Sequence, residues 1–213
     1  MRFVCVLDFE ATCDETPMEH QEVIEFPGVL LEMVDDQLVL RSTFQQYVKP
    51  EHNPLLTQFC MDLTGIQQND VDMGVPFGDA LRNHEEWLRK EIGESPSREN
   101  LLMVTCGDWD LKTMLPKQLA YIRSPFPAYM STFCNLKALM AHRRGTKSQP
   151  RGMTEMLDIF GLQLHGRHHS GIDDCRNIAS VCIAMVKAGY ELVPTAQISF
   201  NADGLVFTRL RLE

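Results

Sequence analysis

The stretch Phe3-Val4-Cys5-Val6-Leu7-Asp8-Phe9-Glu10 joins an apolar run to two carboxylates. Residues 3–9 are largely apolar on both faces and include β-branched valines, which predicts a buried central strand. Asp8 and Glu10 are two positions apart, so on a strand their side chains leave the same face. Two buried anions repel each other and are costly to desolvate unless a cation lies between them. The alternative is that the strand ends at Leu7 and that both carboxylates are solvated.

Outward from this stretch, hydrophobic periodicity predicts the remaining elements. We expect strands at residues 28–34, 39–48, 101–105 and 131–134, and helices at 56–63, 76–92, 110–122, 136–144, 153–160 and 171–188. Strands first in a hairpin and then alternating with helices indicate an α/β fold, a mixed sheet of about five strands with helices packed on it. We expect one domain over residues 1–190. Residues 191–213 form a C-terminal tail that can pack a β-hairpin on the same domain, with strands at 197–200 and 205–210 and a turn at 201–204.

The composition restricts the class of protein. The 213 residues are 44% hydrophobic and 23% charged, which is typical of a soluble globular protein and excludes a disordered chain. The longest apolar run, residues 178–186 apart from Ser180, is about half a membrane span, so we expect no membrane association. The seven cysteines form no C-x-x-C pair, and the N-terminus lacks a signal-peptide pattern. These features predict reduced thiols in a cytoplasmic or nuclear protein.

The charge balance argues against a broad basic surface for nucleic acid. There are 20 Lys and Arg against 29 Asp and Glu, a net charge of −9. Residues 135–190 nevertheless contain eight basic and four acidic side chains, a local charge of +4. An anionic ligand would therefore bind at a local site, such as this segment provides, and not across a broad basic surface.

The last predicted helix carries a carboxylate on its core-facing row. That row is Asp174, Ile178, Cys182 and Met185, at spacings of four, four and three residues. Asp174 therefore needs a partner in the core. Asp173 has a simpler explanation, because Ser170 lies three residues earlier and the two can form a capping box. A break at Ser170 and Gly171 would put His169 on the preceding loop, from where it could reach the site of Asp174.

Asp108 and Asp110 follow the strand at 101–105 and precede a helix. Either can be an N-cap. The alternative places one of them at the carboxyl end of a sheet strand, beside Asp8 and Glu10, where open α/β sheets place their sites.

Together these residues resemble the DEDDh family of 3′→5′ exonucleases, and within it the Eri-type exoribonuclease branch to which histone-mRNA 3′ exonucleases belong. The motifs that carry the resemblance are Asp8-Phe9-Glu10-Ala11-Thr12-Cys13, Ile24-Glu25-Phe26-Pro27, Leu63-Thr64-Gly65-Ile66, Gly107-Asp108-Trp109-Asp110 and Gly166-Arg167-His168-His169-Ser170-Gly171-Ile172-Asp173-Asp174. The resemblance implies a ribonuclease H-like fold. It also implies that the metal ligands are Asp8, Glu10, Asp110 and Asp174, with Glu10 also catalytic, and that His169 is the general base.

The sequence departs from the family pattern in two places. The family usually has Pro before its catalytic histidine, where this chain has His168. The five-residue spacing to Asp174 selects His169, but His168 has the same spacing to Asp173 and is the alternative base. The chain also starts at its first strand, which indicates the short form without the N-terminal nucleic-acid-binding domain of longer members.

Phosphodiester hydrolysis needs a nucleophilic water and relief of charge on the leaving oxygen, and two Mg²⁺ ions supply both, with Mn²⁺ as a substitute. Oxygen ligands favour these ions over zinc, since the sequence indicates no thiolate or multi-histidine cluster. His169 would take a proton from the attacking water, a role worth roughly 10²–10⁴ in rate.

The expected activity is that of a 3′→5′ exoribonuclease that releases nucleoside 5′-monophosphates from RNA 3′ ends, with DNA as a second candidate substrate. The terminal base could stack on an apolar wall. Candidates for substrate contacts are Phe9, Ala11, Trp109, Leu111, Arg167 and His169, and plain core packing is the alternative for Phe9 and Trp109. Two other functions stay open, a non-catalytic adaptor that binds RNA ends on the same fold and a ribonuclease H-like endonuclease. The sequence does not predict the oligomeric state.

Overall fold

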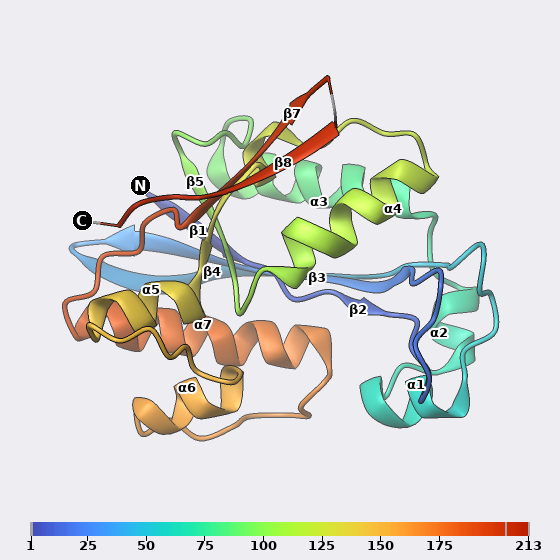
Figure 1. Cartoon of the computed structure of the whole chain (residues 1–213), viewed down its shortest axis with the longest axis horizontal. Coiled ribbons are helices and arrows are strands. Elements are labelled where there is room, and N and C mark those ends of the chain that lie inside the picture. The colour runs from blue at the N-terminus through green and yellow to red at the C-terminus, as the bar shows by residue number, and fades with distance from the viewer. Residues whose placement is uncertain (1, 203, 213) are drawn as a thin grey trace.

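The structure is a computed structural model that describes residues 2–202 and 204–212, and within them one eight-stranded mixed sheet forms the centre (Figure 1). Its strands are β1 (Phe3–Val6), β2 (Glu10–Ala11), β3 (Val23–Val34), β4 (Gln37–Tyr47), β5 (Leu101–Thr105), β6 (Thr132–Asn135), β7 (Ala196–Asn201) and β8 (Gly204–Arg209). Their order is β2-β3-β1-β5-β6-β7-β8, and β4 pairs with β3. β5 is parallel to β1 and β6, and the other pairs are antiparallel. Asp203 of the predicted turn lies outside the described residues.

The predicted first strand is interrupted. β1 ends at Val6, and β2, which is only two residues long, resumes the pairing with β3. Val6 pairs with Val29 and Glu10 with Glu25, which puts Pro27 of β3 opposite Asp8. Proline has no N–H to donate, so the ladder cannot continue at that point. The prediction of one strand over residues 3–9 is therefore wrong after Val6, and the interruption frees the backbone around Asp8.

Helices cover both faces of the sheet (Figure 1). They are α1 (Gln58–Thr64), α2 (Gln68–Asp72), α3 (Phe77–Ile92), the π-helical turn η1 (Trp109–Met114), α4 (Leu115–Tyr121), the short 3₁₀ turn η2 (Ala128–Met130), α5 (Leu136–Arg143), α6 (Met153–Ile159) and α7 (Gly171–Lys187). Side chains alternate along β1: Phe3 and Cys5 pack with α3, η1 and α4, whereas Val4 and Val6 pack with α5, α6 and α7. Among the described residues, no helix is both long and apolar enough to cross a membrane.

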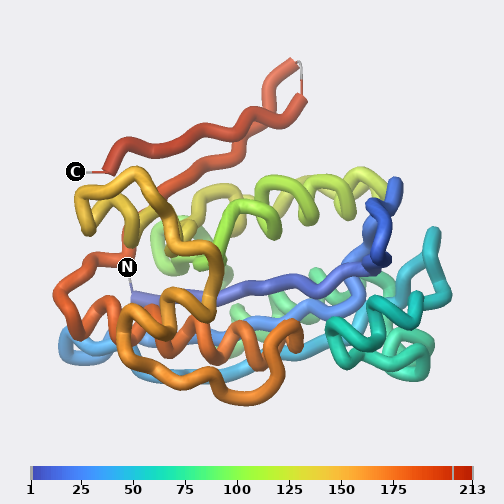
Figure 2. Tube along the Cα trace, turned by 60° about the horizontal axis from the view of Figure 1, so that its bottom comes forward, coloured from blue at the N-terminus to red at the C-terminus, as the bar shows by residue number. Residues whose placement is uncertain are grey.

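The C-terminal residues add two strands to the sheet. β7 pairs with β6 and β8 pairs with β7, and Figure 2 shows this hairpin beyond α4, on the opposite side of the molecule from α6. Together with β2, the hairpin explains why the sheet has more than the five strands expected. β7 and β8 therefore continue the sheet formed by the strands before residue 190. The division of the chain at residue 190 stays a prediction.

Candidate active site

Three predicted carboxylates meet where β1, β2 and the first turn of α7 come together. One oxygen of each of Asp8, Glu10 and Asp174 lies within 4.8 Å of the other two. Asp110 joins them through the backbone, because the N–H of Phe9 donates to Asp110 Oδ1 at 2.9 Å. The structure therefore brings together all four acidic residues that the sequence selected.

Asp110 is placed by η1, the π-helical turn that follows β5. Such turns are rare and frequently occur at functional sites. Its carboxylate is buried, and this burial raises the pKa of Asp110 to about 6. Asp108 has other partners, since its carboxylate accepts hydrogen bonds from Asn135 Nδ2 at 2.6 Å and from the guanidinium of Arg209. Of the two aspartates that the sequence left open, Asp110 belongs to the cluster.

Asp174 is 5% exposed and lies on the core-facing side of α7, as the apolar row of that helix predicted. Its Oδ2 atom accepts a hydrogen bond from the backbone N–H of His169 at 2.9 Å. Its Oδ1 atom is buried and has no hydrogen-bond partner among the described residues. A buried carboxylate oxygen without a partner is costly, so this atom marks a place where a cation fits.

The cluster repels itself electrostatically. Burial raises the pKa of Asp8 well above its ordinary range, and the charges of Asp110 and Glu10 raise it further. Burial, followed by the charges of Glu25 and Asp174, raises the pKa of Glu10 to about 9. Asp8 and Glu10 are partly exposed, so the cluster opens to solvent at this edge. Oxygen donors that repel one another and include an unsatisfied atom fit a divalent cation.

Glu25 is a fifth carboxylate at this site, and the sequence analysis assigned it no role. It is 1% exposed and lies directly opposite Glu10 in the β2–β3 register. Its oxygens accept hydrogen bonds from the N–H groups of Gly171 at 3.0 Å and Ile172 at 3.2 Å, and from Gln45 Nε2 at 2.8 Å. The available signal was the position of Glu25 between apolar residues in the motif Ile24-Glu25-Phe26-Pro27.

The predicted capping box at the start of α7 does not form. Ser170 is the N-cap residue of α7, but its side chain makes no capping hydrogen bond, and its backbone N–H donates to the carbonyl oxygen of Arg167. The Asp173 carboxylate accepts instead from the backbone N–H of Arg167 and from the guanidinium of Arg176, each at 3.0 Å. The capping-box prediction is therefore wrong, because both members of the box have other partners.

The two histidines before α7 lie against each other. Their ring centroids are 3.9 Å apart, and His168 Nε2 is 4.0 Å from Asp174 Oδ2. His169 has a left-handed backbone, with φ of 66°. Burial, with smaller contributions from His168 and Arg167, lowers the pKa of His169.

The predicted substrate-contact residues differ in their exposure to solvent. Phe9 and Leu111 are buried in the core, and Phe9 packs edge-on against Phe26 at 4.8 Å between ring centroids. Ala11 is also buried, and substrate contact at these three positions stays a prediction. Trp109 is 39% exposed and retains an accessible ring. The guanidinium of Arg167 donates to the carbonyl oxygen of Asp62 near the end of α1.

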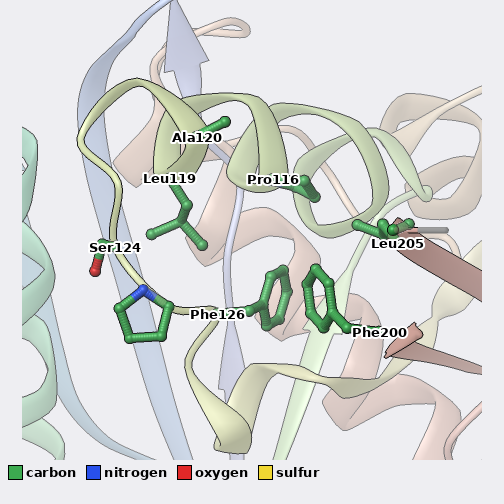
Figure 3. A pocket seen from close by; sticks show the side chains of 9 residues that line it. Pro116, Leu119, Ala120, Ser124, Phe126, Phe200 and Leu205 are labelled. Carbon is green, nitrogen blue, oxygen red and sulfur yellow. The ribbon is translucent and has the colours of Figure 1, made fainter. Parts of the chain in front are cut away.

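A separate apolar cavity of about 590 Å³ lies between α4, the segment after it and the β7–β8 hairpin (Figure 3). Phe126 and Phe200 lie side by side in its wall, with ring centroids 5.8 Å apart. It contains none of the clustered carboxylates.

A carboxylate cluster at the ends of β1 and β5, on a mixed sheet flanked by helices, defines the ribonuclease H-like class of exonucleases. Residues 5–182 match the family described as Exonuclease, and the chain belongs to that family. The family depends on divalent metal ions, in agreement with the chemistry of this site.

Similar proteins indicate which branch of these exonucleases the chain resembles. ERI1 exoribonuclease 3 of Homo sapiens is 40% identical over 195 residues, which cover 92% of this chain and 57% of that protein. The chain therefore spans little more than half the length of that relative. The crystal structure of the nuclease domain of 3′hExo, a DEDDh family member, bound to rAMP is 36% identical, with a TM-score of 0.83 and coverage of 92% of this chain and 97% of that one. A structure of 3′-end specific recognition of histone mRNA stem-loop by 3′-exonuclease gives a TM-score of 0.86 at 33% identity, over 100% of this chain and 72% of that one.

Proposed function

We propose that this chain is a divalent-metal-dependent 3′→5′ exoribonuclease that releases nucleoside 5′-monophosphates from RNA 3′ ends. The observation that carries the proposal is the buried carboxylate cluster, in which Asp174 Oδ1 has no hydrogen-bond partner among the described residues. An adaptor that only binds RNA ends gains nothing from buried groups that repel one another. The named relatives support an RNA substrate, and DNA is a second candidate.

The residues that would hold the metal are Asp8, Glu10, Asp110 and Asp174. Two Mg²⁺ ions, or Mn²⁺ in their place, would supply the positive charge that binds the scissile phosphate and relieves the leaving oxygen. The role of the protein is to keep four carboxylates from distant segments in one place. The hydrogen bond from the Phe9 N–H to Asp110 and the hydrogen bonds from α7 to Glu25 do this without occupying the solvent-exposed edge of the cluster.

His169 is the general base in this proposal. Its N–H bond to Asp174 fixes the loop directly before α7, so the imidazole lies beside the cluster. Its pKa is lowered from the ordinary value, so the ring is neutral at neutral pH and can accept a proton from the attacking water. His168, the alternative base, is disfavoured because Asp173, its partner at the five-residue spacing, is already bound to Arg176.

Trp109 is the substrate-binding residue that the structure supports best. Its exposed ring adjoins Asp110, and stacking of one base on an aromatic ring is worth about 1–3 kcal/mol. Arg167 holds the end of α1 through Asp62, so we assign it to the loop geometry around the site as much as to the substrate.

A single digestion experiment separates the three candidate functions. Single-stranded RNA labelled at its 5′ end is incubated with the protein and Mg²⁺, with its 3′ end either free or chemically blocked. An exonuclease shortens only the free RNA stepwise, an endonuclease cuts both RNAs internally, and an adaptor cuts neither. Chelation of Mg²⁺ should stop the reaction, and Glu10→Gln should abolish it. DNA of the same sequence tests the second substrate.

A further inference from the structure

The loop before α7 brings two imidazoles to one carboxylate. One ring nitrogen of His168, one of His169 and one oxygen of Asp174 all lie within 4.8 Å of one another. The sequence indicated no multi-histidine cluster, and the structure corrects this. In an extended chain, neighbouring side chains point to opposite sides. The left-handed backbone of His169 breaks that alternation, and the two rings lie 3.9 Å apart.

This ligand set differs in kind from the carboxylate cluster beside it. Two imidazole nitrogens and a carboxylate oxygen match the sites in which three protein ligands hold Zn²⁺ and leave a fourth position open. Mg²⁺ prefers oxygen ligands and gains little from imidazole. We propose that His168, His169 and Asp174 form a Zn²⁺ site, and that zinc bound there inhibits the nuclease.

The distances are close to what zinc requires. Ligand atoms about 2.0–2.2 Å from a tetrahedral Zn²⁺ lie about 3.4 Å from one another. His168 Nε2 is 4.0 Å from Asp174 Oδ2, and no pair of the three ligand atoms is more than 4.8 Å apart, so a contraction of at most about 1.4 Å closes the site. The His168 side chain is 41% exposed and can move inward by side-chain rotation.

A second observation at the same place points to a cation. Asp174 is 5% exposed, and its Oδ1 atom has no hydrogen-bond partner within the described residues. Its carboxylate therefore has an unused acceptor in a place where an unpaired one is costly. Asp174 also belongs to the group formed with Asp8 and Glu10, so both ligand sets draw on this one side chain.

Zinc at this site would inhibit the reaction because it would occupy His169 and Asp174, which the reaction needs. This step rests on the proposed nuclease function. An imidazole nitrogen binds zinc through the same lone pair that accepts a proton. His169 bound to zinc therefore cannot act as a base. Asp174 is withdrawn at the same time from the carboxylates that would hold Mg²⁺. Zinc at low concentration should then inhibit a reaction that Mg²⁺ supports.

His168 is the residue that decides zinc binding. It occupies the position where the family usually has Pro, so His168→Pro replaces one zinc ligand with a residue that the family accepts there. His168→Ala is the second variant, in case proline alters the loop. His142→Ala is the matched control, because His142 is an exposed histidine in the last turn of α5 and lines a different pocket with Leu139 and Val193.

The first experiment measures binding without substrate or Mg²⁺. Metal-free protein is titrated with Zn²⁺ against a chromophoric chelator, and Co²⁺ serves as a spectroscopic probe of the ligands. We expect one tight zinc site in the wild type and in His142→Ala, and at least tenfold weaker binding in both His168 variants. Co²⁺ should give the intense visible bands of a nitrogen-containing tetrahedral site only where His168 is present. Equal zinc affinity in wild type and His168 variants of unchanged melting temperature overturns the proposal.

The second experiment measures inhibition at saturating Mg²⁺, with each variant compared with its own rate in the absence of zinc. The zinc concentration that halves the rate should rise at least tenfold in the His168 variants and stay the same in His142→Ala. If RNA is degraded but zinc binding does not depend on His168, the zinc site fails and the nuclease assignment stands. If zinc binds through His168 but RNA is never degraded, the nuclease assignment fails, and with it the inhibition.

Discussion

Glu25 accepts a hydrogen bond from the backbone N–H of Gly171 at 3.0 Å, which joins the beginning of β3 to the first residue of α7. The first N–H groups of a helix have no partner within the helix, and a carboxylate satisfies them well because the helix dipole is positive there. The contact fixes the end of α7 that carries Asp174 and follows His169. Glu25 therefore sets the distance between the helix and the strand that bears Glu10.

Replacement of Glu25 by Ala should lower the free energy of unfolding by about 1–3 kcal/mol, because buried donors lose their acceptor. Glu25→Gln should cost less, since it keeps one acceptor oxygen and removes a charge that faces Glu10. Urea denaturation measures both. Glu85→Ala is the control, because Glu85 forms only an exposed ion pair with Arg89 and should change stability little. A Glu25→Ala protein as stable as the control would contradict this role.

Gly171→Ala should also destabilise the protein, by about 1–3 kcal/mol through overpacking. A Cβ atom at this position would lie 2.9 Å from Glu25 Oε2 and 3.0 Å from the carbonyl oxygen of Asp8. We expect nuclease activity to fall with stability, because α7 must move away from the cluster. Gly152→Ala provides the comparison, since a Cβ there meets nothing within 4 Å. Equal melting temperatures for the two variants would show that α7 tolerates the shift.

Asp174→Asn should raise the melting temperature of the metal-free protein. The substitution removes a buried charge from a cluster that repels itself, while an amide oxygen can still accept from the His169 N–H. The same variant should lose the stabilisation that Mg²⁺ gives the wild type, because a ligand is missing. Thermal melting in chelator and then in Mg²⁺ tests both statements. A lower melting temperature in chelator would mean that the carboxylate has another favourable partner.

His169→Ala should reduce turnover by roughly 10²–10⁴, the usual range for loss of a general base. Stabilisation by Mg²⁺ should persist, because the carboxylate ligands are unchanged. Single-turnover digestion of labelled RNA, with melting in Mg²⁺ as the second measurement, separates catalysis from metal binding. If His169→Ala is active and His168→Ala is not, the base has been assigned to the wrong histidine.

His84 should make stability fall as the pH is lowered. It is fully buried, contacts Tyr129 Oη at 3.1 Å, and burial lowers its pKa to about 3. In the unfolded chain its pKa is about 6.5, so below that pH the unfolded state binds a proton that the folded state cannot. The contribution is lost progressively from about pH 6.5 to pH 3, by up to about 1.4 kcal/mol per pH unit. His84→Gln should flatten this slope in urea denaturation, whereas exposed His142→Gln should not.

The sequence predicted the parts of the site that depend on local pattern. The apolar row of the last helix identified Asp174 as buried, and this conclusion needed only the helical period, because a face is determined by spacing. The D-x-E spacing left the environment of Asp8 and Glu10 open, and the family resemblance selected them. The family and the ribonuclease H-like fold were likewise predicted from motifs and are confirmed by the comparisons.

What could not be predicted depends on partners distant in the chain. Pro27 interrupts the first strand only because the register places it opposite Asp8, and register is a tertiary property. The hydrogen bonds from the start of α7 to Glu25 join two segments that are far apart in the chain, and no spacing within the helix reveals such a partner. The pairing of His168 with His169 required the left-handed backbone, which non-glycine residues adopt rarely.

The β7–β8 hairpin affects both the protection of the sheet edge and the geometry of the candidate active site. It covers the outer edge of β6, and an uncovered edge strand is a template for association with other chains. Its Arg209 also holds Asp108, two residues before Asp110. Removal of the segment after residue 190 would thus leave β6 as an exposed edge strand that favours association, and would loosen the loop that positions Asp110, a proposed metal ligand. A shortened chain would therefore differ from the full chain in both association and site geometry.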